Sequence, residues 1–444
     1  MRKVFFLFAL FLFAANVFSQ EQAEQNVASE AESVESAAQD SDKDSRKNAS
    51  VDYAAKIAGA ENLPIARFDI SGLKRTKRSY MDNLLAEFNG KPVSVPTIKM
   101  IETTLQAQNL FDQINVSAKA LDDGQAAVEI SFKEKWSLLP LPVGYYTDGS
   151  YALGLFLMDM NTFGQHCTTI LGGIYSPNTI MGAGVFRKPP AKKGKLGFSI
   201  AANVSRSKHT FADSKNIGVY TYKNFYSGAR ANILFKPTNA TTASVGAGYS
   251  FFEPIDSPNV RRTNQWSAAA TWGISSSSWN GYFLSVNSFD VGAEFLFSDN
   301  PEQRFAQTFE FGGQAQRPIY ERIRLMTAAR GFFSNDLLET NFVGRAKSGV
   351  TLLPSSFATN QIFGLFSGLE VAVAKSKFGM LSVYALYEVA VARDWDKTFY
   401  ACHGPEAGVR IYLAKVAFPA FAFGASYNIN EDRFQYSFSG GASF

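Results

Sequence analysis

The feature that most constrains this chain is the alternation of apolar with small or polar residues between Ser137 and Phe444. In Ser288–Ser298, apolar side chains occupy every second position, and Asp290, Gly292 and Glu294 fall between them. A period of two is typical of a β-strand whose faces meet different surroundings. Acids opposite a phenylalanine row are tolerable when the row faces lipid and the acids face a wet lumen. The pattern predicts a transmembrane β-barrel, because closure satisfies every strand backbone within lipid.

The length of this region sets the size of the barrel. Residues 137–444 divide into about sixteen antiparallel strands, at roughly nineteen residues per strand and connection. Composition agrees, since 40 Phe, 18 Tyr and 34 Gly accompany only 18% charged residues. A secreted β-sandwich or propeller is the soluble alternative. We expect outer loops near Ser207–Ser227, Pro254–Thr263, Leu338–Phe363 and Trp395–Pro405. Periplasmic turns are expected near Thr162–Gly164, Pro189–Gly194 and Lys375–Gly379.

Two segments without a strand pattern begin the chain. Residues 1–19 have the features of a secretory signal peptide, with Arg2 and Lys3 before an apolar stretch from Val4 to Ala15. Residues 20–61 consist mainly of Glu, Ala, Ser, Asp and Gln and bury too little apolar surface to offset their ordering entropy, which predicts an acidic disordered linker. An export signal and a barrel together predict a location in a bacterial outer membrane.

Residues 62–136 have the periodicity of a small α/β domain. A strand ends at Ser71-Gly72, and a second helix opens near Pro96. The first helix is indicated by apolar residues at helical spacing: Tyr80, Leu84, Leu85 and Phe88. Two further strands, Phe111–Ala118 and Ala126–Phe132, alternate and are joined by a turn sequence. The expected order is strand, helix, helix, strand, strand.

Residues that could carry covalent chemistry are scarce. The 2 Cys and 3 His are too dispersed for a disulfide framework or a zinc site. Cys402 and His403 are neighbours, so an extended strand would direct them to opposite faces. Cys167 is expected at the periplasmic rim and Cys402 in an outer loop, too far apart for a disulfide. We therefore expect no enzymatic activity, catalytic residue, metal or cofactor, and the net charge of +4 is too weak to indicate nucleic acid.

The segment 62–136 resembles a single POTRA (polypeptide transport-associated) domain. The resemblance rests on Ile70-Ser71-Gly72, on Asn109-Leu110-Phe111-Asp112, and on Val128-Glu129-Ile130 with Glu134. It implies a periplasmic domain that binds extended client chains by adding a strand to an exposed sheet edge. A spacer domain without a partner is the alternative.

Together with the last strands, this segment resembles the BamA superfamily, also described as the bacterial surface antigen family. The resemblance is strongest from Gly404 to Phe444, and Asp159-Met-Asn-Thr-Phe-Gly164 is similar to the family's Asp-x-Asn-x-x-Gly turn. It implies assembly, insertion or translocation of other polypeptides without covalent chemistry. The implied partners are outer-membrane lipid, unfolded client polypeptides and periplasmic accessory proteins.

The terminal strand, Gln435–Phe444, would form one side of the lateral seam that the resemblance implies. Tyr436, Phe438, Gly440 and Phe444 share one face of it. In the family the first and last strands pair weakly, so that the seam opens toward the membrane. The adjacent Gly440 and Gly441 fit weak pairing, because glycine weakens a strand. Tight packing at closure is the alternative interpretation of these glycines.

The family's Arg-Gly-aromatic motif, which folds a long outer loop into the lumen, is missing from the corresponding loop here. The string Arg330-Gly331-Phe332 lies in a strand pattern, where Arg330 should face the lumen. The long loop Leu338–Phe363 holds one arginine, Arg345. Glu370 and Glu388 match the family's lumen-facing acids, so we hypothesise that Arg345 pairs with one of them and pins the loop. The alternative is a solvated Arg345 with glutamates that only line the lumen.

Three further points stay open at this level. The same fold could serve as a dedicated exporter of one protein or lipid client. A passive porin or a surface adhesin is an alternative of another class. The basic stretch Lys188–Lys195 is interpreted as a solvated turn, with a binding patch as the second possibility.

Overall fold

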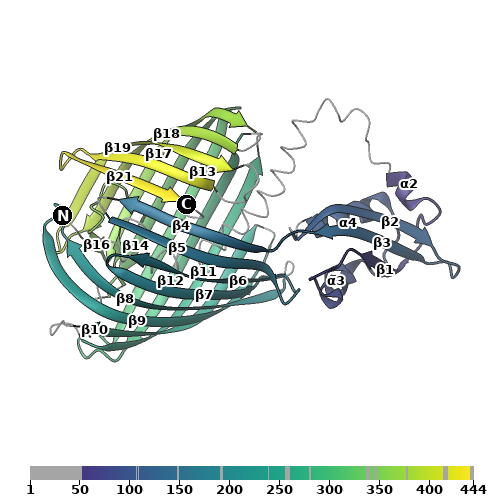
Figure 1. Cartoon of the computed structure of the whole chain (residues 1–444), viewed down its shortest axis with the longest axis horizontal. Coiled ribbons are helices and arrows are strands. Elements are labelled where there is room, and N and C mark those ends of the chain that lie inside the picture. Colours follow the sequence, from purple (N-terminus) through teal and green to yellow (C-terminus); the bar gives the residue numbers. More distant parts are fainter. Residues whose placement is uncertain are drawn as a thin grey trace.

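The computed structural model describes residues 53–444 except 107, 109, 148–149, 191–193, 239, 256–260, 280–281, 337–340, 345–347, 377–378, 414–418 and 441–444. The expected signal peptide, most of the expected linker, Arg345, Gly441 and Phe444 lie outside the described residues. The chain forms a closed antiparallel barrel with a small α/β module at one end, which we call the module end (Figure 1). No helix in the described part of the chain is long and apolar enough to cross a membrane.

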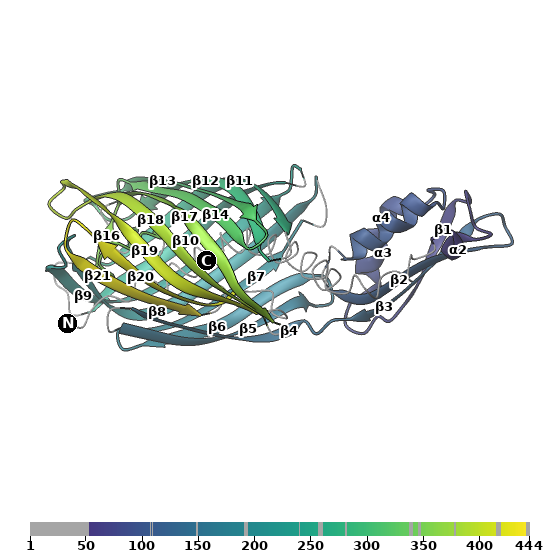
Figure 2. The same cartoon turned by 90° about the horizontal axis from the view of Figure 1, so that it is seen from above.

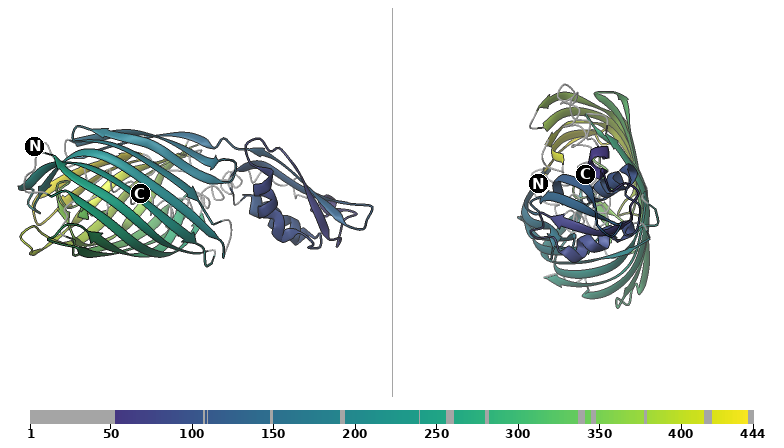
Figure 3. Two further views of the ribbon diagram at one scale, coloured as in Figure 1. Left: turned by 90° about the horizontal axis from the view of Figure 1, so that it is seen from below. Right: turned by 90° about the vertical axis from the view of Figure 1, so that its right-hand side faces the viewer.

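Sixteen strands form the barrel, as the sequence predicts, and each pairs with its neighbour in the chain until β21 closes on β4. The first eight are β4 (Leu138–Thr147), β5 (Ser150–Thr162), β6 (Cys167–Ser176), β7 (Thr179–Lys188), β8 (Leu196–Ala212), β9 (Gly218–Phe235), β10 (Thr241–Ile255) and β11 (Thr263–Trp279). The other eight are β12 (Leu284–Ser298), β13 (Phe305–Tyr320), β14 (Ile323–Ser334), β17 (Gln361–Ser376), β18 (Gly379–Arg393), β19 (Phe399–Leu413), β20 (Pro419–Asn428) and β21 (Arg433–Gly440). Figure 3 shows these strands tilted against the barrel axis, as closure requires.

Alternation along the strands separates an apolar outer face from the interior. In β12, Phe289, Phe295 and Phe297 point outward and are 44%, 40% and 47% exposed, whereas Leu296 is 6% exposed. Cys402 and His403 of β19 lie on opposite faces as expected, because Cys402 is 1% exposed and His403 contacts the outward-facing Tyr387. Both cysteines are free thiols.

Two expected loops at the far end of the barrel are shorter than the sequence indicated. β8 continues to Ala212 and β9 begins at Gly218, within the expected loop Ser207–Ser227. These extensions carry Phe211 and Tyr222, which pack together inside the barrel. β19 begins at Phe399, so Cys402 lies in a strand paired with β18 and not in a loop.

The module is a three-stranded sheet with two main helices on one face (Figure 2). Its elements are α2 (Tyr53–Ile57), β1 (Ile65–Ser71), α3 (Arg78–Leu85), the 3-10 turn η2 (Ala86–Phe88), α4 (Val95–Gln106), β2 (Phe111–Ala120) and β3 (Ala126–Glu134). β3 lies between β1, to which it is parallel, and β2, to which it is antiparallel, so β1 and β2 are edges. The expected order of elements is therefore present.

The end of the expected linker departs from the disorder predicted for residues 20–61. α2 lies within that range, and Ile57 and Ala60 are buried in the module core, with Tyr53 packed against it. Tyr53 also donates a 2.7 Å hydrogen bond to Glu102 of α4. These few apolar contacts order a short segment whose composition alone indicates a linker.

The module is joined to the barrel by its loop between β1 and α3. Glu134, at the end of β3, holds this loop by accepting the backbone N–H groups of Arg75 and Thr76 at 2.8 and 2.9 Å. Burial raises the pKa of Glu134, but these N–H donors outweigh it and hold the pKa below its usual range. The Arg75 guanidinium donates to Ser137 at 2.6 Å and pairs with Asp159 at 2.9 Å.

The turn between β5 and β6 supplies the barrel side of this joint. The side chain of buried Asn161 donates from Nδ2 to the Thr76 hydroxyl at 2.9 Å, and its Oδ1 accepts the His166 backbone N–H at 2.9 Å. The Gly164 carbonyl accepts the Lys77 N–H at 2.8 Å. A Cβ at Gly164, whose φ is +67°, would lie 2.1 Å from the Arg75 carbonyl oxygen, so glycine is required there. The Asp, Asn and Gly positions of the Asp159–Gly164 turn therefore all serve the joint.

Replacing Asn161 with Ala should loosen the joint. The change leaves the partly buried His166 N–H without its side-chain acceptor, at a cost of about 0.5–1.5 kcal/mol, or roughly two- to tenfold in an equilibrium. Hydrogen exchange at the Lys77 amide, which bonds to Gly164, should accelerate accordingly. Gln165→Ala in the same turn is the matched control, and unchanged exchange in Asn161→Ala would contradict this role.

The joint should also weaken as the solution becomes acidic. His166 Nδ1 lies 3.2 Å from the Tyr80 hydroxyl, and burial, with a further contribution from Arg187, lowers its pKa to about 4. Undocked, the imidazole would titrate near its usual value of about 6.5. The undocked state then binds more protons between these pKa values, so docking is stable above about pH 6.5 and weakens toward pH 4.

Energy transfer between dyes on the module and the barrel would measure this change. His166→Gln, which cannot titrate, should give a flat profile across the same pH range. A joint that loosens on raising the pH would contradict the assignment.

Candidate functional site

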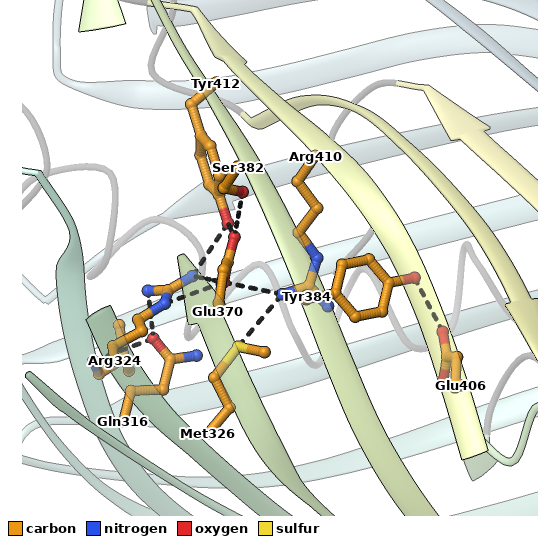
Figure 4. Close-up of polar contacts among 10 residues, drawn as sticks. Gln316, Arg324, Met326, Glu370, Ser382, Tyr384, Glu406, Arg410 and Tyr412 are labelled. Carbon is orange, nitrogen blue, oxygen red and sulfur yellow. Dashed lines mark hydrogen bonds and ion pairs between the residues drawn. The ribbon is translucent and has the colours of Figure 1, made fainter. Parts of the chain in front are cut away.

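The candidate site lies inside the barrel, on the wall formed by β14, β17, β18 and β19. Glu370 of β17 is fully buried there, and side chains of three other strands converge on it (Figure 4). Arg324 donates to Glu370 Oε2 from Nε at 3.0 Å and from Nη2 at 2.7 Å, and Arg410 donates to the same oxygen at 3.0 Å. Oε1 accepts the Tyr412 hydroxyl at 2.8 Å and the Ser382 hydroxyl. Both carboxylate oxygens of Glu370 are thus saturated.

The strand register explains why these groups meet. Arg324 of β14 lies directly opposite Glu370, and the Arg410 guanidinium stacks 4.2 Å above the ring of Tyr384, the partner of Glu370 on β18. A buried carboxylate is tolerable only with opposite charge and further hydrogen bonds. The cluster therefore fastens four neighbouring strands near the module end.

The structure leaves open the proposed pairing of Arg345. Arg345 lies outside the described residues, and among those described the cations on Glu370 are Arg324 and Arg410. The sequence reasoning named neither as a partner. Strand parity is the signal that could have found Arg324, because it shares a face with Arg330, which was expected to face the lumen.

The described parts of the loop between β14 and β17, residues 335–336, 341–344 and 348–360, fold into the barrel. The loop contains the short strands β15 (Val343–Gly344) and β16 (Ala358–Thr359), which pair with each other. Its buried apolar residues Val343, Val350, Leu352, Leu353 and Phe357 pack on wall residues that include Phe332, Phe366, Ala390 and Cys402. A Cβ at Gly364 of β17 would lie 2.8 Å from Val350 Cγ2, so the wall has room for the loop only with glycine there. We call residues 348–357 of this loop the plug.

Thr351 attaches the plug to two buried glutamates. Its N–H lies 2.9 and 3.1 Å from the two oxygens of Glu388, and its hydroxyl lies 2.7 Å from Glu388 and 3.2 Å from Glu406. Glu388 is fully buried and Glu406 is 8% exposed. Glu388, one of the two acids expected to hold the loop, therefore does contact it, through a threonine and backbone N–H groups. Sequence reasoning missed Thr351 and Glu406, because a single threonine carries no pattern.

The plug is also attached to the last two strands of the barrel, β20 and β21. Ser426 of β20 donates to the Thr351 carbonyl at 3.0 Å. The Leu352 carbonyl accepts the Asn428 side chain at 3.2 Å and that of Gln435, on β21, at 2.7 Å. Leu352 is fully buried. We call Thr351 and Leu352 with these partners the clasp.

The closing seam of the barrel joins β21 to β4. Among the described residues it comprises four partner pairs, from Ser437 opposite Thr147 to Gly440 opposite Gly144. The next pairing, β4 with β5, comprises ten. Tyr436 is 60% exposed on the outer face, and Phe438 packs 4.6 Å from the ring of Phe423. Two glycines thus face each other where the described ladder ends.

Two prolines of β4 lie further along this strand, toward the module end. Thr147 and Ser150 form the last pair before the β4–β5 turn, and in a two-residue hairpin this pair is hydrogen-bonded. Because the bonding side alternates along a strand, the N–H and C=O groups of odd-numbered residues of β4 point to β5. Those of even-numbered residues point to β21. Pro140 and Pro142 are even-numbered and lack an N–H. β4 therefore offers no donor to the seam at these two positions, while its ladder with β5 loses none.

Removing the Glu388 carboxylate should release the plug. Glu388→Ala leaves the Thr351 and Leu352 N–H groups without their acceptor, which favours the released state by about 1–3 kcal/mol, or roughly five- to hundredfold. Cys402, 1% exposed beneath the plug, is a natural reporter of that release. In a Cys167→Ser background, labelling of Cys402 by a water-soluble maleimide should accelerate by that factor. Ser355→Ala in the same loop should leave the rate unchanged, and equal rates in both variants would refute the clasp.

Comparison with known proteins supports the fold and leaves the family open. No protein-family model matches the chain, and no curated protein matches it in sequence. The structure is similar to BamA from Haemophilus ducreyi lacking POTRA domains 1–3, with a TM-score of 0.59 and 13% identity over 86% of this chain and 85% of that one. It is also similar to CdiB from Acinetobacter baumannii, with a TM-score of 0.60 and 12% identity over 86% and 74% of the two chains. For CdiB from Escherichia coli the TM-score is 0.54, with 11% identity over 86% and 91%. The chain therefore has the fold of the BamA and CdiB barrels.

Proposed function

We propose that this protein is an outer-membrane barrel that inserts or translocates other polypeptides without covalent chemistry. The observation that carries the proposal is the seam, which has four partner pairs among the described residues, together with the loop that fills the lumen and is fastened to β21. The fold shared with BamA supports it, as do the motifs that resemble that superfamily. Lipid would contact the apolar outer face, and the α/β module would lie in the periplasm.

The seam offers a chemical reason for such an activity. A strand edge held by few hydrogen bonds can exchange its partner for a strand of a client chain, and inside lipid that client has no water to satisfy its backbone. The edge strand β2 of the module would provide a first site for an extended client by strand addition, because the edge of β1 already bonds to Lys91 and Arg78. Main-chain bonds at both places would accept clients of varied sequence.

The clasp argues against a passive porin. The plug occupies the interior and bonds to four strands, so a wide permanent channel is not the resting state that these contacts favour. Because Gln435 lies on β21, the plug is tied to one side of the seam. Opening the seam and releasing the plug should therefore favour each other.

Cross-linking in cells would test the proposal. With Cys167 and Cys402 replaced by Ser, a cysteine at Val143 of β4 or Ser437 of β21 should form adducts with client chains. Val291→Cys in β12, far around the barrel from the seam, should form none. Many adducts would indicate general assembly and one would indicate a dedicated exporter, whereas their absence at both seam positions would overturn the proposed function.

Restoring the missing donors in β4 should suppress those adducts. Pro140→Val with Pro142→Val gives the strand two more N–H groups toward the seam, worth about 0.5–1.5 kcal/mol each, or roughly five- to hundredfold together. Leu139→Val with Leu141→Val changes the same strand without adding a donor, and it should leave the yield unchanged. Equal yields from the two double variants would show that the prolines do not weaken the seam.

A further inference from the structure

A surface of aromatic and basic side chains lies at the module end of β5–β8. We call Phe163, Phe186, Phe198, Lys188 and Lys195 the basic–aromatic rim. Phe163 is in the β5–β6 turn, and Phe186 and Lys188 are at the end of β7. Lys195 directly precedes β8, and Phe198 is near the start of that strand. None of these residues contributes to the plug, the clasp or the seam.

The three phenylalanines form a continuous row on the outer face. The ring centroids of Phe163 and Phe186 are 6.0 Å apart, and those of Phe186 and Phe198 are 5.8 Å apart. The side chain of Phe163 is 70% exposed, which is unusual for a large aromatic side chain. Aromatic rings at the end of an apolar face are typical of the level where hydrocarbon meets headgroups.

The lysines lie just beyond this row. Lys188 lies on the same face of β7 as Ile180 and Phe186, because the three positions differ by even numbers, so its side chain belongs to the outer face. In the ladder between β7 and β8 it is paired with Phe198. Lys195 immediately precedes Leu196, which is 67% exposed on the same face. Both lysines are exposed, and the next turn adds Lys236, whose carbonyl accepts the Gly194 N–H at 2.9 Å. A lysine here keeps its stem beside apolar surface and its ammonium in the headgroup layer.

Acidic residues are sparse around the rim, and the nearest in sequence, Asp159 of β5, pairs with Arg75 of the module. Residues 160–252 contain a single acid, Asp213, which lies in the far-end loop between β8 and β9. The same stretch has five basic residues between Arg187 and Lys195. A turn selected only for solubility would not need to exclude carboxylates from four consecutive strands, β6 to β9.

We propose that the basic–aromatic rim binds the headgroup phosphate of anionic phospholipids in the leaflet on the module side. The inference rests on the membrane placement proposed above. Lysine offers a compact point charge suited to phosphate, and each one near an anionic surface contributes about 1 kcal/mol. The rim thereby anchors the strands beside the module at a fixed depth.

Lipid retention in nanodiscs would test the rim. Wild-type protein in a mixture of phosphatidylcholine and phosphatidylglycerol should retain phosphatidylglycerol above its bulk fraction, as measured by native mass spectrometry. Lys188→Gln with Lys195→Gln should weaken that retention roughly thirtyfold, for two lysines at about 1 kcal/mol each. Lys188→Arg with Lys195→Arg should preserve it.

Lys215→Gln with Lys397→Gln removes the same charge from far-end loops and is the matched control. An equal loss of phosphatidylglycerol retention in both Gln double variants would contradict lipid binding by the rim. Equal retention of the two lipids by the wild-type protein would also contradict it. Barrel insertion is scored separately in each sample by resistance to unfolding in detergent. If the wild-type protein does not insert, the proposed membrane placement is wrong. If it inserts without a lipid preference, only the proposed lipid binding by the rim is wrong.

Discussion

Closure of the sheet between β21 and β4 is the interaction on which the rest of the structure depends. A barrel in lipid must pair every strand, because an open edge has no water to satisfy it. Here the described part of that last pairing is four residues long, and β4 contributes prolines where further donors would stand. Contacts inside the barrel therefore add support to the wall beside the described seam pairs. The clusters inside the barrel supply that support, on strands just before the closing pair.

The buried glutamates show two solutions to one physical problem. Glu370 is neutralised by two guanidinium groups and tyrosine and serine hydroxyls, all from strands, which makes a fixed part of the wall. Glu388 is held by the N–H groups and hydroxyl of a loop, which makes a contact that can separate. Removing a strand partner from Glu370 would leave a buried charge unpaired, whereas moving the plug lets water reach Glu388. The first cluster is suited to rigidity and the second to release.

The sequence predicts the features that depend on periodicity and fails where side chains meet across the barrel. Sixteen strands, the outward phenylalanine rows and the order of elements in the module all follow from alternation and turn residues. The ends of β8, β9 and β19 do not, because pairing with neighbours and aromatic packing extend strands beyond the local pattern. Glu370 and Glu388 were found by parity and resemblance. Thr351 was not, since its importance lies in a loop path that no local sequence encodes.

The joint connects the module to the same hairpin that borders the seam. Arg75 bonds to Ser137, directly before β4, and to Asp159 of β5, so the module is fastened to the first two strands of the barrel. Because β3 leads into β4 through three residues, Lys135 to Ser137, little slack separates the module sheet from the seam strand. A client strand added to the module would then be carried toward β4, which lacks an N–H donor at Pro140 and Pro142. The two prolines of the seam and the joint with the module therefore both lie on the β4–β5 hairpin. The plug is bonded to the other side of the same seam through Gln435 of β21.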